Sequence, residues 1–182
     1  MPSRLPPELR SCLEAIRLLI LDVDGVLTDG SLVYGPEGEV FKIFNARDGM
    51  GIRLLLDEGL KVGVISGRSH PSVLVRMKEL GCEESMIILG SRDKREDMRV
   101  LQGLAGSCSD RETATIGDDL SDLPMLLKAG FSACPADASP DVAAFCDYVC
   151  GSRGGAGVAR EIAELILKAR GRWSDMLAAW KK

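Results

Sequence analysis

Two aspartates, Asp22 and Asp24, stand at the end of the apolar run Leu18–Val23. Because they are spaced by one residue where extended backbone gives way to a loop, both carboxylates can face one pocket. There Asp22 could attack a phosphorus atom and hold it covalently. Asp24 could protonate the leaving oxygen and then take a proton from water. Gly25 gives the turn its conformational freedom. Alone, this pattern is more typical of an ordinary acidic strand exit.

Asp118, Asp119 and Asp122 form a second acidic cluster late in the chain. Magnesium takes oxygen ligands, and in phosphate chemistry it uses one or two carboxylates together with waters and phosphate oxygens. Asp118 could complete a magnesium site with the Asp22 carboxylate and the Asp24 carbonyl, where the cation would neutralise the transferring phosphoryl group. We expect Asp119 and Asp122 to orient these ligands or to cap the following helix.

A serine and a lysine between the two acidic clusters fit the same chemistry. Ser66 opens Ser66-Gly67-Arg68 after a buried apolar run, where its hydroxyl and the N–H groups of a helix start can hold phosphate. Lys94 offers a cation to a phosphoryl oxygen. Each also has a plain structural interpretation, Ser66 as a helix cap and Lys94 as a solvated helix residue. The order of the four elements along the chain favours the chemical interpretation.

The elements that must position these side chains alternate along the chain, with strand-like apolar runs separated by segments that carry apolar residues at helical spacing. The predicted strands are Leu18–Val23, Lys61–Ile65, Met86–Leu89, Thr113–Ile116, Phe131–Cys134 and an edge strand Asp147–Val149. The predicted helices are 7–16, Gly49–Glu58, Pro71–Leu80, Lys94–Leu104, Leu120–Ala129 and Val158–Ala169. This alternation predicts an α/β fold, a Rossmann-like parallel sheet flanked by helices, whose ligands bind at the carboxyl ends of the strands.

One segment breaks this alternation. Gly-Pro-Glu-Gly separates two apolar stretches, Ser31–Tyr34 and Glu39–Phe44, which predicts a β-hairpin projecting after the first strand. No interval between the chemical residues is long enough to contain a cap domain. We therefore expect a single domain over residues 1–182, with the hairpin 31–44 and a C-terminal tail 171–182.

Charge and composition exclude several classes of protein. With 23 Lys+Arg against 27 Asp+Glu, a net charge of −4, the chain lacks the basic excess of a nucleic-acid-binding protein. A single histidine, His70, excludes zinc sites that need two imidazoles. No apolar run approaches the roughly 20 residues of a membrane span, and six cysteines without a C-x-x-C pair indicate reduced thiols. We expect a cytoplasmic protein with a small-molecule partner, and neither nucleic acid nor membrane.

The order Asp-x-Asp-Gly, Ser, Lys and Gly-Asp-Asp-x-x-Asp, within Leu18–Arg170, resembles that of the haloacid dehalogenase-like phosphohydrolases. Members with an aspartate two residues after the nucleophile are typically phosphatases, and Asp24 fulfils that pattern. The resemblance implies a catalytic set and a site for Mg²⁺. The implied catalytic residues are Asp22, Asp24, Ser66 and Lys94, and the implied magnesium ligands are Asp22, Asp24 and Asp118.

A finer resemblance is to the phosphatases of 3-deoxy-D-manno-octulosonate 8-phosphate, which release phosphate from an eight-carbon acid sugar used to build lipopolysaccharide. It rests on the segments Asp22–Gly30, Phe44–Ile52, Ser66–Arg68, Gly117–Asp122 and Gly154–Gly157. The implied substrate-binding residues are Asp24, Asn45, Ala46, Arg47, Asp48, Gly49, Arg53, Arg68, Arg76 and Lys94. The residue chemistry agrees, since Arg53, Arg68 and Arg76 could supply a second anion site for the sugar carboxylate.

An uncapped site would leave a phosphoenzyme exposed to water. We therefore expect a homotetramer in which neighbouring subunits cap the site through the hairpin, as in the resembling family. Apolar hairpin residues would be costly to expose singly and suit an interface. They are Leu32, Val33, Val40, Phe41, Ile43 and Phe44.

Three features depart from the family pattern. Ala156 stands where a charged residue is frequent in the Gly-Gly-x-Gly loop, so no substrate contact is assigned to that loop. The segment Cys82–Ile88 is about two residues longer than usual, which could shift Lys94 slightly. The tail, with Trp173 and Trp180, extends past the usual end and is interpreted as an amphipathic helix that docks on the same or a neighbouring subunit.

Three alternatives remain. A phosphatase of the 2-keto-3-deoxy-nononate 9-phosphate type tends to have Glu after the Ser/Thr-Gly pair and Lys near the end of the next helix, whereas Arg68 and Glu79 favour the eight-carbon acid. A signalling receiver domain would place its acidic pair before a phosphorylated aspartate on a later strand, whereas Asp22 comes first here. A non-catalytic assembly partner is disfavoured because every catalytic position is occupied.

Overall fold

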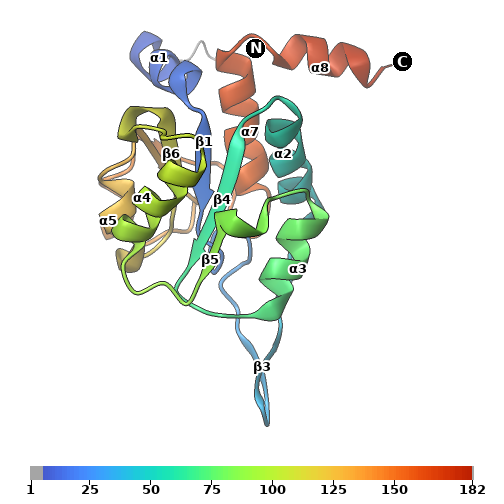
Figure 1. The fold of residues 1–182 in the computed structure, drawn as a ribbon, viewed down its shortest axis with the longest axis vertical. Coiled ribbons are helices and arrows are strands. Elements are labelled where there is room, and N and C mark those ends of the chain that lie inside the picture. Colours follow the sequence, from blue (N-terminus) through green and yellow to red (C-terminus); the bar gives the residue numbers. More distant parts are fainter. Residues whose placement is uncertain (1–5, 182) are drawn as a thin grey trace.

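The computed structural model describes residues 6–181. Within that range six parallel strands form the central sheet, which lies between two layers of helices (Figure 1). In spatial order the strands are β5 (Ile87–Leu89), β4 (Lys61–Ser66), β1 (Leu18–Leu21), β6 (Thr113–Ile116), β7 (Phe131–Cys134) and β8 (Tyr148–Val149). The helices are α1 (Pro7–Ala15), α2 (Ala46–Asp57), α3 (Pro71–Glu79), α4 (Lys94–Leu104), α5 (Leu123–Leu126), α6 (Pro140–Ala143), α7 (Val158–Ala169) and α8 (Trp173–Ala179). This confirms the predicted α/β class.

The apolar run of β1 is buried along its whole length because both faces of the sheet are covered. Leu19 and Leu21 belong to the larger core cluster, which contains residues of α1, α2, α3 and α7. Leu18 and Ile20 point to the other face and belong to a smaller cluster with α4 and α5. Strand β1 therefore consists of consecutive apolar residues and shows no polar alternation.

The register of the sheet brings the ends of the strands together. Leu21, the last residue of β1, pairs with Val64 on one side and with Ile116 on the other. Because the strands are parallel, their carboxyl ends share one edge of the sheet. The residues after β1, β4 and β6 therefore emerge side by side.

The predicted hairpin is present as β2 (Val33–Gly35) and β3 (Gly38–Phe41), an antiparallel pair separate from the main sheet. Its strands are shorter than the predicted stretches Ser31–Tyr34 and Glu39–Phe44. It projects from the edge of the sheet at which β1 ends, at the far end of the molecule from α1 and α8 (Figure 1).

The largest differences from the predicted elements concern α2, α5 and α6. Helix α2 begins at Ala46, three residues before the predicted start, because the Asn45 side chain accepts the N–H of Arg47 and caps the helix. The predicted helix Leu120–Ala129 is a 3₁₀ turn followed by only the four residues of α5. The short α6 had no counterpart among the predicted helices.

The segment before β5 contains a 3₁₀ turn, η1 (Glu84–Met86), and Lys94 is the first residue of α4. A shift of Lys94 relative to the family pattern stays a prediction. The side chain of Asp93 accepts the N–H groups of Arg95 and Glu96, which fixes the start of this helix.

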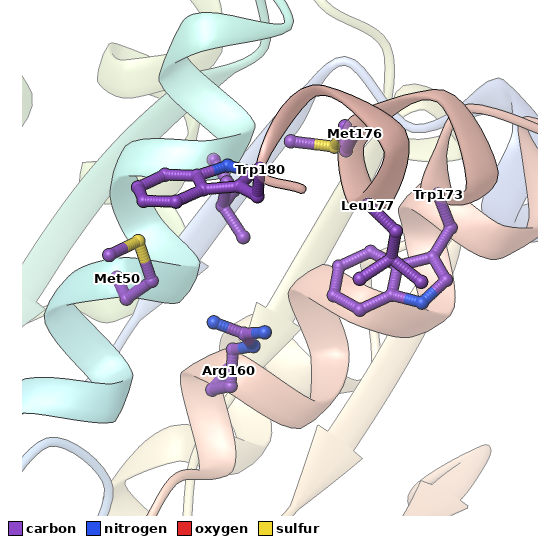
Figure 2. Close-up of a pocket in the computed structure, with 7 residues that line it drawn as sticks. Met50, Arg160, Trp173, Met176, Leu177 and Trp180 are labelled. Carbon is purple, nitrogen blue, oxygen red and sulfur yellow. The ribbon is translucent and has the colours of Figure 1, made fainter. Parts of the chain in front are cut away.

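The tail forms α8, which docks on its own chain. Trp173 packs against the larger core cluster and lies between two cations, about 5.3 Å from Arg160 and 5.2 Å from Lys168. The Arg172 guanidinium lies 2.7 Å from Glu58 at the end of α2. A cavity of about 260 Å³ lies between α8, α2 and α7. Figure 2 shows the residues that line it, which are Met50, Leu54, Arg160, Trp173, Met176, Leu177 and Trp180. Among residues 6–181, no helix combines the length and the apolar character needed to cross a membrane.

Candidate active site

The first acidic pair lies directly beyond β1. Asp22 continues the strand by donating its N–H to the carbonyl of Ile116, at 3.0 Å, so its carboxylate is held at the edge where β1 and β6 end. The chain then turns at Gly25, whose φ of +87° lies in the region that favours glycine. A Cβ at Gly25 would lie 2.1 Å from the Asp118 carboxylate, so only glycine allows the two loops to approach this closely.

Lys94 joins the two acidic clusters. Its Nζ lies 2.6 Å from Asp22 Oδ1 and 2.5 Å from Asp122 Oδ1, and all three side chains are buried. Burial acts to lower the pKa of Lys94, but the two carboxylates outweigh it and raise that pKa. The lysine therefore remains a cation beside Asp22, as its predicted role requires.

Three carboxylates, those of Asp22, Asp118 and Asp122, offer oxygen atoms that all lie within 4.8 Å of one another. Burial and the neighbouring Asp122 raise the pKa of Asp22 to about 7. Burial and the charges of Asp122 and Asp119 raise the pKa of Asp118 to about 7 as well. Converging oxygen ligands whose charges repel one another favour a divalent cation such as Mg²⁺, so the residues fit the implied metal.

Asp122 orients the loop that carries Asp118, and its side chain makes no capping hydrogen bond to α5. Its Oδ2 accepts the N–H groups of Asp118, at 2.9 Å, and of Asp119, at 3.2 Å, which stabilises the loop after β6. Its Oδ1 holds Lys94. Asp119 is exposed and accepts the N–H of Leu120, so it caps the 3₁₀ turn η3 (Leu120–Asp122).

Ser66 ends β4 on the same edge of the sheet and is buried. Its Oγ accepts the N–H of Arg68, at 3.2 Å, which orders the first turn of the loop that follows. The helix-cap interpretation of Ser66 is wrong, because α3 begins only at Pro71 and its N-cap residue is His70. Contact of the Ser66 hydroxyl with phosphate stays a prediction.

The hairpin contributes a cation that the sequence analysis missed. Lys42 is buried, with its Nζ 2.5 Å from Asp24 Oδ1 and 2.6 Å from Glu39 Oε1. Burial acts to lower the pKa of Lys42, but the hydrogen bonds to these carboxylates raise it. The other oxygen of Glu39 lies 3.1 Å from Arg68, whose guanidinium also donates to the Tyr34 hydroxyl at 2.5 Å. The sign of this contact in the sequence was a lysine between the apolar residues Phe41 and Ile43.

The predicted substrate-binding segment Asn45–Gly49 lies at the start of α2. Asn45 donates to the carbonyl of Gly155 at 3.0 Å. The buried Asp48 carboxylate accepts the N–H groups of Gly157, Ala159 and Arg160 at the start of α7. Direct contact of Asp48 with substrate stays a prediction, and the structure gives this side chain a further task, which is to anchor the glycine loop.

That glycine loop, Gly154–Gly157, supports the turn after β1. The N–H of Gly155 donates to the carbonyl of Val26 at 2.9 Å. A Cβ at Gly154 would lie 2.0 Å from the carbonyl oxygen of Gly25. The loop therefore needs glycine for close backbone contact, which explains its sequence without any substrate contact.

The remaining predicted residues do not all gather in one place. The Arg76 guanidinium lies over Gly49, where a Cβ would be 2.3 Å from it, and shares a small cavity with Asn45. Arg47 lines a different hollow together with residues of α7. Ala46 and Arg53 are exposed on α2. The structure thus brings together Asp22, Asp24, Ser66, Lys94 and Asp118, and it places the arginines around them at different positions.

A parallel sheet with an Asp-x-Asp pair beyond its first strand, a lysine bound to the first of these aspartates, and a later acidic loop defines the class of haloacid dehalogenase-like hydrolases. The family model described as haloacid dehalogenase-like hydrolase matches residues 99–162. The divalent-metal chemistry of that class agrees with the acidic cluster.

More specific relatives match nearly the whole chain. The 3-deoxy-D-manno-octulosonate 8-phosphate phosphatase of Haemophilus influenzae is 42% identical over 162 residues, covering 89% of this chain and 88% of that protein. The cobalt-bound structure of the deoxy-D-mannose-octulosonate 8-phosphate phosphatase from H. influenzae has a TM-score of 0.89 at 40% identity, covering 94% of this chain and 99% of the other. The enzyme from Moraxella catarrhalis, solved with magnesium, phosphate and KDO, has a TM-score of 0.89 at 37% identity, covering 95% and 98%. The chain belongs to the family of 3-deoxy-D-manno-octulosonate 8-phosphate phosphatases.

Proposed function

We propose that this enzyme hydrolyses 3-deoxy-D-manno-octulosonate 8-phosphate to the free sugar acid and phosphate, with Mg²⁺ as its metal, in the supply of lipopolysaccharide precursors. The observation that carries the proposal is the contact of Lys94 with Asp22 beside the Asp118 and Asp122 carboxylates. This arrangement provides a nucleophile, a cation and a metal site at one strand edge. Relatives of that name at about 40% identity support the substrate.

In this mechanism Asp22 attacks phosphorus. A bond forms between its carboxylate oxygen and phosphorus while the bond from phosphorus to the sugar oxygen breaks. Asp24 gives its proton to the leaving sugar oxygen. Asp24 then removes a proton from a water molecule, whose oxygen attacks phosphorus and frees the Asp22 carboxylate. Lys94 and Ser66 stabilise the phosphoryl oxygens during both steps.

Magnesium would be held by the carboxylates of Asp22 and Asp118 and by the Asp24 carbonyl. When bound, it supplies positive charge that neutralises these carboxylates and the phosphoryl group. Asp122 and Asp119 orient the loop that carries Asp118, as their hydrogen bonds to its backbone indicate.

Recognition of the sugar acid falls to the segment Asn45–Gly49 and to Arg53, Arg68 and Arg76. Arg68 and Arg76 lie at different positions. Arg68 lies beside the hairpin, and Arg76 lies over the start of α2. Guanidinium groups suit the carboxylate at the far end of the substrate because they bind planar anions with two hydrogen bonds.

We propose a homotetramer in the cytoplasm, with the single domain of each subunit capped by hairpins of its neighbours. Five apolar hairpin residues are exposed, which supports an interface there. They are Leu32, Tyr34, Val40, Phe41 and Ile43. Light scattering tests this assembly, and a fully active monomer would contradict it. Six free cysteines in residues 6–181 agree with a reducing compartment.

The experiment that tests the function is phosphate release from a panel of acid-sugar phosphates, with and without Mg²⁺. We expect the eight-carbon 8-phosphate to be hydrolysed fastest and only with the metal. Faster hydrolysis of a nine-carbon 9-phosphate would instead identify the enzyme as a phosphatase of nine-carbon acid sugars of the sialic-acid type. Absence of hydrolysis on the whole panel would indicate a non-catalytic assembly partner.

A further inference from the structure

Lys42 stands at the base of the hairpin, inside the molecule. Its side chain is 1% exposed, although it belongs to a segment whose neighbours Phe41 and Ile43 face solvent. Long basic side chains ordinarily keep their charge in water, so a buried lysine needs carboxylates nearby. It finds two, Asp24 at 2.5 Å and Glu39 at 2.6 Å.

The contact with Asp24 involves one oxygen of the carboxylate, Oδ1. An acid–base carboxyl group must present its other oxygen to the reacting atom at hydrogen-bond distance, and small displacements of such a group are costly. A cation that holds Oδ1 fixes the plane of the carboxyl group and leaves Oδ2 for the sugar oxygen and, later, for water. The Asp24 side chain is 20% exposed, so it remains reachable from the substrate side.

Glu39 connects this contact to the rest of the rim. One of its oxygens binds Lys42 and the other binds Arg68, which also contacts Tyr34 of the same hairpin. Charges alternate along this row, from Asp24 through Lys42 and Glu39 to Arg68. A shift of the hairpin therefore moves the lysine that holds the acid–base group and the glutamate that holds a substrate-binding arginine together.

We propose that Lys42 is a positioning residue for Asp24, acting from the hairpin of the same subunit, and that Glu39 couples it to Arg68. The inference rests on the proposed function, since it assumes that Asp24 exchanges the proton with the leaving oxygen. The hairpin thus has a task within its own active site besides any contact with a neighbour.

The test compares an alkyl with an aryl phosphate in each variant. The value of kcat/KM reports the steps up to release of the leaving group and excludes the later hydrolysis of the phosphoenzyme. A sugar alkoxide needs a proton in order to leave, whereas 4-nitrophenolate leaves without one, so in kcat/KM only the alkyl ester reports on proton donation by Asp24. We expect Lys42→Met to lower kcat/KM for the best sugar phosphate about 100-fold, the low end of acid–base contributions, and to lower that for 4-nitrophenyl phosphate less than about threefold. Lys42→Arg, which keeps the charge, should recover about tenfold of the loss on the sugar phosphate.

Lys78→Met is the matched control, because Lys78 is an exposed lysine paired with Glu84 away from the rim, and it should leave both esters unchanged. Circular dichroism and Tm verify folding, and Lys42→Gln replaces Lys42→Met if the latter does not fold, with the same selective loss expected. An equal loss on both esters, no loss on the sugar phosphate, or no recovery in Lys42→Arg would overturn the proposal.

The outcome for the proposed function is read separately, from the wild-type enzyme. If wild type prefers another sugar phosphate, the substrate assignment fails. The alkyl-to-aryl ratio of the Lys42 variants is then measured with that preferred ester and still decides the role of Lys42.

Discussion

At the carboxyl ends of β1 and β6, burial and like charges raise the pKa of Asp22 and of Asp118 to about 7. At the amino ends of the same two strands the situation is reversed. There the Ser109 N–H and hydroxyl and the Arg17 guanidinium lower the pKa of Glu112 to about 2. The carboxyl ends of these strands carry several carboxylates and too few cations to neutralise them. The amino ends carry one carboxylate, Glu112, that accepts several hydrogen bonds.

The two ends also differ in what their ion pairs cost. Lys94 is buried with Asp22 and Asp122, and Lys42 is buried with Glu39, so these charges are desolvated and strongly coupled. In the pairs Arg17–Glu112 and Arg172–Glu58 both arginines are about half exposed, and ion pairs open to solvent contribute little to stability. The carboxylates at the carboxyl end therefore repel one another, which favours binding of a divalent cation there, whereas the carboxylate Glu112 at the amino end is already stabilised by its neighbours.

The largest expected effect comes from removing the nucleophile. Asp22→Asn should lower phosphate release by about 10⁴-fold or more, because a covalent intermediate can no longer form. The carboxylate also repels its neighbours, so Tm should not fall. Asp175→Asn, an exposed aspartate at the other end of the molecule, should leave the rate unchanged. Near-wild-type turnover in Asp22→Asn would contradict the assignment of Asp22 as nucleophile, and with it the assignment of catalysis to the carboxyl end of the sheet.

A second substitution tests whether Asp48 stabilises the loops at the carboxyl end of the sheet. Asp48→Asn replaces a carboxylate that accepts three N–H groups by an amide that also brings a donor. We expect the free energy of unfolding to fall by about 2 kcal/mol or more, since a hydrogen bond to a charged group contributes about 1.5–3 kcal/mol. Urea unfolding measures it, with the exposed Asp57→Asn as the control. A raised KM with unchanged stability would instead make Asp48 purely a substrate ligand.

The raised pKa values predict how magnesium and pH act together. Between the ordinary carboxyl pKa near 3.8 and about 7, Asp22 and Asp118 hold more protons in the folded protein than in the unfolded chain. Their contribution to the free energy of unfolding therefore falls as pH rises through this window and levels off above it. Magnesium competes with these protons, so saturating Mg²⁺ should raise Tm more at pH 8 than at pH 5.5. At about 100 times Kd the binding of Mg²⁺ stabilises the folded protein by about 2–3 kcal/mol.

Differential scanning calorimetry in Mg²⁺ and in NaCl of equal ionic strength measures this linkage. The Asp118→Asn variant, which removes one oxygen ligand, should lose most of the increase at pH 8. An increase of the same size at both pH values would contradict the assignment of raised pKa values to the metal ligands.

The smallest effect is expected at the amino end. Because the pKa of Glu112 is lowered, its contribution to stability is present above the ordinary pKa of 4.5 and is lost as pH falls towards about 2. Glu112→Gln should lower Tm slightly at pH 7, and the difference from wild type should vanish at pH 2. Activity should not change. A loss of Tm that persists at pH 2 would show that the loss does not come from the carboxylate charge.

Much of the fold followed from local patterns. The strands ending at Leu21, Ile116 and Cys134 are short buried segments that contain only apolar residues, threonine and serine, and all three lie near their predicted bounds. Boundaries set by side-chain caps were less accurate. The start of α2 was missed because Asn45 caps it, and the helix over Leu120–Ala129 was overestimated because Pro124 and a 3₁₀ turn shorten it.

The site was predicted to the extent that its residues lie at strand ends. Asp22 and Asp118 converge because β1 and β6 are parallel neighbours, a consequence of the alternation of strands and helices. Lys42 and the anchoring task of Asp48 were not predicted. Lys42 reaches Asp24 across 18 residues by the folding back of the hairpin, and Asp48 reaches α7 across more than a hundred.

The sequence by itself determined the class of fold, the edge of the sheet that carries the chemistry, and the carboxylates placed there, because apolar periodicity and residue type are properties of short segments. Only the tertiary structure decided which carboxylates are buried together, that Lys94 and Lys42 each bridge two of them, and that the glycine loop supports the turn at Gly25. The physical reason is that the pKa of a side chain and the strength of an ion pair depend on burial and on neighbours distant in sequence. These are set when the sheet, the hairpin and the helices pack.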